Sequence, residues 1–431
     1  MSFNPGAASA VTDVHRRAMA ALQQQRHAEA VDIWKQIVSL APDDQPANAG
    51  LGRWALGERD LDLAVHYLTR AARADGRNPR VWIDVALVHQ QRADAAGEDE
   101  ALFEALKSDP QDLLALLMRG ALHERMGRSA AALDAYIAAT TVAPPPERVS
   151  PDLRPALAHA AEVRQAHEDR LAEFMDAALE ANFREHAAED LARVRLMLDI
   201  LLRRKRRFDS QPSRHFVPGL QAVEFFDRAL FPWMDAIEAG TDRIRDEFLA
   251  LLRADEDFPP YIAYGADQPV EQWAELNHSP RWSCYHLWRD GQPVAAHLAQ
   301  CPETARLLAA APRPDLPGRT PVAMFSLLKP HTLIPPHSGA TNARLVCHLP
   351  LIVPAGCRFR VGNTVREWVP GRAWAFDDTI EHEAHNDSDQ LRVILIWDAW
   401  HPHLSEAERH MITAMNGALN AFSGSDSAFG A

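Results

Sequence analysis

The chain has 431 residues with a formal net charge of −14, and 47% of its residues are apolar. This length is enough for two or three domains, and the apolar share is enough for packed cores. The negative charge argues against a general nucleic-acid-binding protein, whose contact surface would be basic.

An internal repeat with a period of 34 residues occupies residues 11–145. Four columns share its register: the breakers Pro42, Gly76, Pro110 and Pro144; the column Ala30, Ala64, Glu98 and Ala132; the bulky residues Trp34, Leu68, Leu102 and Tyr136; and Ile37, Ala71, Ala105 and Ala139. Small residues let two antiparallel helices approach closely, and a proline ends the second helix. The pattern resembles the tetratricopeptide repeat, which binds peptides or proteins, so we expect a peptide or protein partner on this unit.

A proline-rich break at residues 143–151 ends the repeats, and residues 146–209 again have a helical pattern. Leu171, Phe174, Met175 and Leu179 recur at helical spacing. A solenoid needs a cover for its last apolar face, so we expect a capping helix pair that also links to the next domain.

The third domain is expected over residues 210–415, followed by a flexible tail at residues 416–431. Two short helices are predicted between residues 233 and 253, and a hairpin over residues 282–296 turns at Asp290-Gly291. One further helix begins at Pro302, and strands begin near Thr320. The predicted class is α+β and multidomain, with an all-α solenoid before a β-rich domain.

The stretch from Met324 to Arg409 contains the candidate chemistry. Short runs of Val, Ile, Leu, Phe and Trp are separated by turn-forming pairs, which is typical of strands. His337 and His382 each lie beside such a turn, and Arg392 begins a strand ten residues after the second histidine. Imidazoles and a basic residue on neighbouring strands suit a non-haem iron site with a dicarboxylate co-substrate.

Several blocks of this region, in order, resemble the aspartyl/asparaginyl β-hydroxylase family of iron(II)- and 2-oxoglutarate-dependent oxygenases. They are HFVPGL, WSCYHLWRDG followed by CPET, FSLLKPHTLIPPHSGATNARLVCHL, and FDDTIEHEAHNDSDQLRVILIWDAWHP. The resemblance covers nearly 200 residues, about 216–409, and animal members also carry tetratricopeptide repeats. It implies a double-stranded β-helix, or jelly-roll barrel, for this domain.

Matching positions imply site residues. His337 and His382 would be the iron ligands, and Ser326, His348 and Arg392 would bind 2-oxoglutarate, with Arg392 on its far carboxylate. Arginine suits that role because its planar fork binds carboxylates bidentately and stays charged when buried. Alternation along a strand also places Arg344, Val346 and His348 on one face.

Two positions depart from common patterns. Gly339 stands where most such oxygenases have an acidic third ligand, as is expected in this family. Val346 stands where the family often has an arginine that holds 2-oxoglutarate, so Arg344 is a candidate substitute. Asp377 and Asp378 are interpreted as turn residues rather than ligands.

The resemblance implies an O₂-consuming dioxygenase that hydroxylates an unactivated carbon, the β-carbon of an aspartyl or asparaginyl residue in a peptide held by the repeats. Three alternatives stay open: hydroxylation of a small molecule or lipid acyl chain, a repeat-based binding protein with a weakly active barrel, and a cupin-like isomerase or metal-storage barrel. A requirement for 2-oxoglutarate would distinguish the oxygenase from the isomerase or metal-storage barrel.

Four cysteines without CxxC spacing indicate reduced thiols. The N-terminus lacks an apolar signal segment, and no run of about 18 apolar residues occurs. We therefore expect a cytoplasmic protein without membrane contact.

Overall fold

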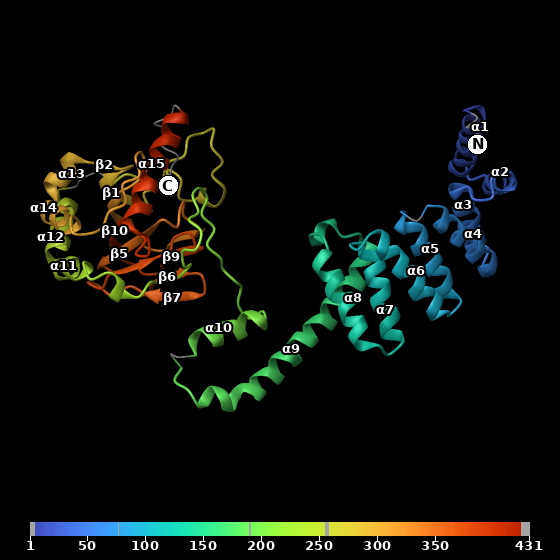
Figure 1. The fold of residues 1–431 in the computed structure, drawn as a ribbon, viewed down its shortest axis with the longest axis horizontal. Helices are drawn as coiled ribbons and strands as arrows, with labels where there is room; N and C mark the ends of the chain where they lie inside the picture. The colour runs from blue at the N-terminus through green and yellow to red at the C-terminus, as the bar shows by residue number, and fades with distance from the viewer. Residues whose placement is uncertain (1–4, 76, 189–190, 255–257, 424–431) are drawn as a thin grey trace. The chain divides into compact units, whose positions relative to one another are not determined.

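The computed structural model describes residues 5–75, 77–188, 191–254 and 258–423. The chain divides into two compact units, residues 1–192 and 193–431 (Figure 1). Among the described helices, none has both the length and the apolar character needed to cross a membrane. The four cysteines are buried and unpaired.

The first unit is a stack of antiparallel helix pairs (Figure 1). Its paired helices are α1 (Pro5–Gln23), α2 (His27–Leu40), α3 (Gln45–Gly57), α4 (Leu61–Ala74), α5 (Pro79–Gln91), α6 (Ala95–Ser108), α7 (Leu113–Arg125) and α8 (Ser129–Val142). Side chains of Asp44, Asn78 and Asp112 accept a backbone N–H at the starts of α3, α5 and α7, which fixes those starts.

The predicted repeat register is the packing register of this unit. Ala64, Leu68, Leu102 and Ala105 are buried in one core along the stack. A side chain at Gly120 would collide with the Tyr136 ring, so the glycine permits the close approach of α7 and α8. Glu98, the exception in its column, is buried and accepts from Arg125 Nη2 at 2.7 Å with both carboxylate oxygens. These pairs confirm the helical repeat unit.

The segment after the repeats differs from the predicted capping pair. Two short 3₁₀ turns, η1 (Pro146–Arg148) and η2 (Pro151–Leu153), lead into one long helix, α9 (Arg154–Arg184). Only its first turns cover the end of the stack, where Ala160 joins the core around Tyr136. Leu171 and Phe174 are 38% and 68% exposed, because α9 extends past the packed helices. Helix α10 (Ala192–Leu201) follows, almost wholly within the second unit.

The second unit consists of two antiparallel sheets with short helices on one face. The six-stranded sheet has the order β2-β1-β3-β10-β5-β8 and the four-stranded sheet the order β4-β9-β6-β7. The strands are β1 (Trp282–Arg289), β2 (Gln292–Pro293), β3 (Ala323–Leu328), β4 (Thr332–His337), β5 (Arg344–Ile352), β6 (Cys357–Val361), β7 (Thr364–Glu367), β8 (Trp374–Phe376), β9 (His382–Asn386) and β10 (Arg392–Trp400). The antiparallel β-rich domain is confirmed, and its jelly-roll connectivity stays a prediction.

Helices cover the outer face of the larger sheet (Figure 1). After α10, the helical segments of this unit are η3 (Arg228–Leu230), α11 (Met234–Ala239), α12 (Thr241–Arg253), η4 (Glu271–Trp273), α13 (Ala295–Gln300), α14 (Pro302–Leu308) and α15 (Glu406–Ser423). Along β10, Val393, Leu395 and Trp397 pack into the core under the helices. The alternate positions of β10 therefore face the other sheet.

Two local predictions can be compared with the structure. The predicted hairpin is present, since β1 pairs with β2 and both Asp290 and Gly291 have the positive φ angles of a tight turn. The expected tail is wrong at its start, because α15 continues through residue 416 to Ser423. Asn416 is 1% exposed and donates to Pro317 O at 2.9 Å, which anchors the helix. Residues 424–431 lie outside the described residues.

Candidate active site

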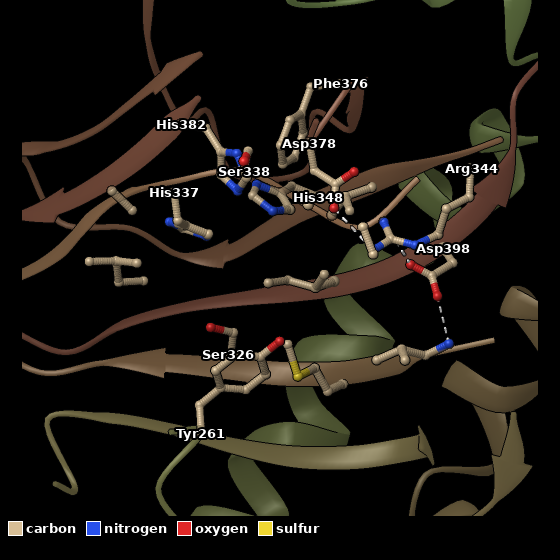
Figure 2. Close-up of a pocket in the computed structure, with 18 of the residues that line it drawn as sticks. Tyr261, Ser326, His337, Ser338, Arg344, His348, Phe376, Asp378, His382 and Asp398 are labelled. Carbon is tan, nitrogen blue, oxygen red and sulfur yellow. Dashed lines mark hydrogen bonds and ion pairs between the residues drawn. The ribbon is translucent and has the colours of Figure 1, made fainter. Parts of the chain in front are cut away.

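A cavity of about 620 Å³ lies between the two sheets. Strand residues of both sheets line it, among them Met324 and Ser326, His337, Val346 and His348, His382, and Arg392, Ile394 and Asp398. The structure thus brings all of the predicted site residues to one cavity (Figure 2). Arg344, Val346 and His348 do share one face of β5, as alternation predicts.

His337 and His382 are cross-strand partners on β4 and β9. Their ring centroids are 4.0 Å apart, and Figure 2 shows them side by side. Nδ1 of His337 donates to Pro335 O at 2.8 Å, and Nδ1 of His382 donates to Ile380 O at 3.0 Å. These bonds place the proton of each neutral ring on Nδ1, so both Nε2 atoms keep a lone pair for a ligand.

Both histidines are held in the neutral form. Burial, and then the neighbouring His382, lowers the pKa of His337 to about 3. Burial lowers the pKa of His382 to about 4. Within the described part of the chain, no group of three or more His, Cys, Asp or Glu side chains is placed to hold a metal ion. The donor set available to a metal is therefore two neutral imidazoles, which suits a first-row transition metal.

Arg392 begins β10 and is 1% exposed, and its charge has no carboxylate partner among the described residues. Nη1 donates to the carbonyl oxygen and to Oγ of Ser326, each at 3.4 Å, and Nε has no partner among the described residues. Burial lowers the pKa of Arg392 to about 10, which leaves it charged at neutral pH. A buried, uncompensated guanidinium is a site for an anion.

Ser326 and His348 add donors beside this guanidinium. Ser326 Oγ accepts from Trp282 Nε1 at 3.2 Å, so its own proton stays available. Trp368 Nε1 donates to His348 Nδ1 at 3.4 Å, which places the proton of the neutral imidazole on Nε2. Burial, and then Arg392, holds the pKa of His348 well below its usual value. Val346 lies in the same cavity and adds no charge.

Arg344 does not have the arrangement expected of a co-substrate ligand. Its Nη2 lies 3.0 Å from Asp378 Oδ2 and its Nη1 lies 3.4 Å from Asp398 Oδ1 (Figure 2). Burial opposes the charge of Arg344, but Asp378 and Asp398 outweigh it and raise the pKa of the guanidinium. Because two carboxylates already neutralise it, Arg344 does not replace the arginine that Val346 lacks. That expectation is corrected.

Both aspartates lie in the turn of residues 377–380, as interpreted, but their side chains have different partners. Asp377 Oδ1 accepts from the backbone N–H and the hydroxyl of Thr379, at 3.0 and 2.5 Å, as a turn residue does. Asp378 instead holds Arg344, and its carboxylate lies against the Cα of Gly339. Any side chain at Gly339 would collide with this carboxylate. The packing therefore leaves no room at position 339 for the acidic third ligand that most such oxygenases have.

A segment that the sequence did not mark forms one wall of the cavity. Gln211 N donates to Thr379 O at 2.7 Å, just before His382, and Ser213 N donates to Gly339 O at 3.1 Å, just after His337. Gln211, Ser213 and Arg214 line the cavity. From the sequence we interpreted this stretch as a domain boundary, because its Ser and Pro content is typical of a loop. Its contribution to the cavity could not be predicted, because its hydrogen-bonding partners lie more than 100 residues further along the chain.

Aromatic side chains complete the cavity and were also missed. Tyr261 stacks on Trp282 with centroids 4.2 Å apart, and Trp273 meets His337 edge-on at 5.0 Å. Tyr261 lies in an irregular segment and Trp273 is the last residue of η4, and both stand between α12 and β1. These rings give the wall beside His337 and Ser326 an aromatic surface.

Helical repeats are followed by two antiparallel sheets that enclose a neutral histidine pair and a buried arginine without a carboxylate partner among the described residues. The chain is thus a repeat-bearing protein whose second unit has a cavity with donors suited to a metal and an anion. The profile of the family described as Aspartyl/Asparaginyl beta-hydroxylase matches residues 238–402. The second unit therefore carries a domain of the aspartyl/asparaginyl β-hydroxylase family.

Curated relatives agree with this assignment. The chain is 31% identical over 209 residues to the human aspartyl/asparaginyl beta-hydroxylase, covering 48% of this chain and 26% of that protein. It is 31% identical over 214 residues to human aspartate beta-hydroxylase domain-containing protein 2, covering 47% and 54%. It is 34% identical over 197 residues to the ornithine lipid ester-linked acyl 2-hydroxylase of Rhizobium tropici, covering 45% and 66%. The matched part thus spans about a quarter to two thirds of these relatives.

Solved structures overlap the chain weakly. A crystal structure of MamA is 15% identical and covers 39% of this chain and 90% of its own, with a TM-score of 0.31. The Arabidopsis OM64 TPR domain is 17% identical and covers 28% and 95%, with a TM-score of 0.25. The repeat fold of the first unit rests on its own helix pairs and its 34-residue register.

Proposed function

We propose that the chain is an iron(II)- and 2-oxoglutarate-dependent dioxygenase that hydroxylates an unactivated carbon. One observation carries the proposal: two neutral histidines with Nε2 lone pairs lie in the same cavity as a buried arginine that has no carboxylate among the described residues. Imidazoles are suitable ligands for iron(II), and the arginine suits the carboxylate of a co-substrate.

Each residue has a defined task in this proposal. His337 and His382 would hold iron(II), and their Nδ1 hydrogen bonds fix the ring orientations. Arg392 and the hydroxyl of Ser326 would bind the distal carboxylate of 2-oxoglutarate, while His348 Nε2 donates beside them. When bound, iron(II) supplies O₂ activation: one oxygen atom enters the substrate, the other enters 2-oxoglutarate, and the products include succinate and CO₂.

The proposed target is the β-carbon of an aspartyl or asparaginyl residue in a peptide or protein presented by the repeats. Two of the relatives carry names for aspartate or asparagine β-hydroxylation, and a repeat array suits an extended peptide. The second candidate is an acyl chain, which is favoured by the name of the Rhizobium tropici relative. A binding protein with a weakly active barrel would show neither activity at a useful rate.

The test is iron(II) binding and 2-oxoglutarate turnover in His337→Ala and His382→Ala, with His331→Ala as the matched control. His331 is exposed and pairs with Asp389, so its loss should change neither property. Each site variant should lose tight iron(II) binding, measured by anaerobic calorimetric titration, and succinate production. Normal iron binding in both folded variants would contradict the two-histidine site.

Peptide delivery by the repeats has its own test. A fragment that begins at Ser210 keeps the wall formed by Gln211–Arg214 and should still decarboxylate 2-oxoglutarate slowly. It should hydroxylate a peptide target much less efficiently than the full chain, because the repeats raise the local concentration of that target. Equal efficiency would assign the repeats to assembly and favour the acyl or small-molecule substrate.

A further inference from the structure

Trp368 is a buried tryptophan that has no task in the proposed function as described so far. It directly follows β7 and belongs to the loop that leads from the four-stranded sheet to β8 of the six-stranded sheet. Its neighbours Glu367 and Val369 are exposed, whereas Trp368 is 4% exposed and lines the cavity. The loop therefore turns one large aromatic ring inward, toward the site.

The loop that carries Trp368 is tied to the strand that carries His348. Gly371 N donates to Pro350 O at 3.0 Å, and Pro350 lies two residues after His348 on β5. Gly371 has a φ angle of 78°, which a residue with a side chain rarely adopts, so the glycine permits the turn. The backbone thus holds Trp368 at a fixed place relative to His348.

Two aromatic side chains hold the ring of Trp368 in turn. Trp374 stacks on it with centroids 6.0 Å apart and an interplanar angle of 17°. Phe359 lies at 5.4 Å with an angle of 31°. Because all three rings are buried, the indole cannot rotate without displacing its neighbours, and the direction of its N–H is set by packing.

This N–H determines which nitrogen of His348 carries the proton. Nε1 of Trp368 lies 3.4 Å from Nδ1 of His348. An indole N–H can only donate, so Nδ1 accepts and the proton of the neutral imidazole lies on Nε2. His348 is 4% exposed, so bulk water does not replace the indole as donor. The tryptophan therefore leaves His348 with one N–H to offer to a ligand in the cavity.

The face of the same indole lies against Arg392. Cζ of Arg392 is 5.1 Å from the ring of Trp368, which is a cation–π distance. This contact stabilises the buried guanidinium without supplying a negative charge, so the charge stays available for an anion. Nη1 of Arg392 also donates to Ser326 Oγ at 3.4 Å, and the ring and the hydroxyl together restrict the orientation of the guanidinium.

We propose that Trp368 is a positioning residue for the co-substrate, which sets the tautomer of His348 with its N–H and supports the guanidinium of Arg392 with its ring. The inference rests on the proposed function and adds a residue to its co-substrate site. A side chain that contacts both donors keeps them in one arrangement, so they lose little freedom when a dicarboxylate binds. Among the described residues, no hydrogen bond or ring contact joins Trp368 to His337 or His382, so iron(II) binding should not depend on it.

The experiment compares Trp368→Phe and Trp368→Leu with the matched control Trp374→Phe in the full chain. Phenylalanine at position 368 keeps a ring face for Arg392 and removes the N–H, whereas leucine removes both. Trp374 is buried in the same stack, and its N–H has no hydrogen-bond partner among the described residues, so Trp374→Phe removes a similar volume without removing a hydrogen bond. Calorimetric titration under argon measures iron(II) binding and then 2-oxoglutarate binding to the iron-loaded protein.

A second measurement reports the tautomer of His348 directly. Two-bond proton–nitrogen correlation spectra of the histidine-labelled chain, without metal or co-substrate, distinguish the two neutral forms of an imidazole, and His348→Gln identifies the signal of His348. The wild-type chain and Trp374→Phe should have the proton on Nε2. Trp368→Phe should shift the proton at least partly to Nδ1, a change that a purely structural role of Trp368 would not produce.

Trp368→Phe should raise the dissociation constant of 2-oxoglutarate about 5-fold and Trp368→Leu about 30-fold or more, while Trp374→Phe should change it less than about 2-fold. Iron(II) affinity should be the same in all four proteins. If Trp368→Leu does not fold, Trp368→Phe alone decides. An unchanged His348 signal in Trp368→Phe, or an equal loss of 2-oxoglutarate affinity in Trp374→Phe, overturns the positioning role. If the tautomer and the affinity change as expected while no succinate forms, the proposed activity fails and the positioning role stands.

Discussion

The two units handle buried charge in opposite ways. In the repeats, buried Glu98 is matched by Arg125, whose side chain is 48% exposed, so both charges are satisfied at the edge of the stack. In the second unit, Arg392 is almost fully buried and has no carboxylate partner among the described residues. The first arrangement is satisfied within the fold. The second is costly unless an anion arrives, which is why it indicates a binding site.

The largest effect is expected from Arg392→Met, which removes the uncompensated charge. Removing one partner of a buried charge pair typically costs about 2–5 kcal/mol, so the 2-oxoglutarate requirement should rise about 30-fold or more. The protein without co-substrate should not be destabilised, because the charge it loses was unpaired. Succinate formation against 2-oxoglutarate concentration measures the first expectation and thermal unfolding the second. Arg358→Met, in an exposed pair with Asp387, is the control, and a requirement unchanged by Arg392→Met would place the distal carboxylate elsewhere.

Asp378→Asn tests a buried charge that is already compensated. It leaves Arg344 with only Asp398, and breaking a buried pair costs about 3–5 kcal/mol, so roughly 2–4 kcal/mol of unfolding free energy should be lost. Iron(II) binding should persist, since Asp378 is not a ligand in the proposed site. Chemical denaturation and anaerobic iron titration measure the two properties. Asp387→Asn should cost less than about 1 kcal/mol because its partner is exposed. Loss of iron binding in a folded Asp378→Asn protein would make this carboxylate a ligand.

Glu98→Ala probes the corresponding pair in the repeats and should have a smaller effect. Alanine is the usual residue of that column, and the freed Arg125 can be hydrated because it is half exposed. The unfolding free energy should therefore change by less than about 1.5 kcal/mol. A loss as large as that of Asp378→Asn would show that the repeats depend on buried charge as the second unit does.

The smallest expected effect is a difference between the two units in the stability that each loses on acidification. Burial lowers the pKa of His286, His382 and His401 to about 4 in the second unit, against about 6.5 when unfolded. Such groups are neutral when folded, so stability is full above pH 6.5 and is lost as the pH falls toward 4. Burial raises the pKa of Asp377 to about 6, which offsets part of this loss.

Hydrogen exchange followed by mass spectrometry on the metal-free chain at pH 7 and pH 5 resolves the two units. We expect the second unit to lose more protection than the repeats. Earlier opening of the repeats would reverse the comparison.

The sequence predicted the features that are periodic or local. The 34-residue register, the hairpin turn and the strand-and-turn texture each depend on residues close along the chain, and the structure contains all three. The blocks around His337, His382 and Arg392 were sufficient to find one cavity. The Arg344–Asp378–Asp398 network was not predicted, because its members lie on separate elements and carry no shared spacing. The length of α9 was also missed, since helical periodicity does not show which turns are covered by a neighbour.

The segment at residues 210–217 has a consequence for how this chain can be divided. The family profile begins at residue 238, yet the backbone at Gln211 and Ser213 is bonded to the loops that flank both histidines. A recombinant or naturally shuffled domain cut at the profile boundary would lose the HFVPGL block and the Gln211–Arg214 wall, and its cavity would have an open side. The structural domain therefore begins earlier in the chain than the family profile does. Any repeat array fused to this domain has to be joined before residue 210, so that residues 210–217 are kept.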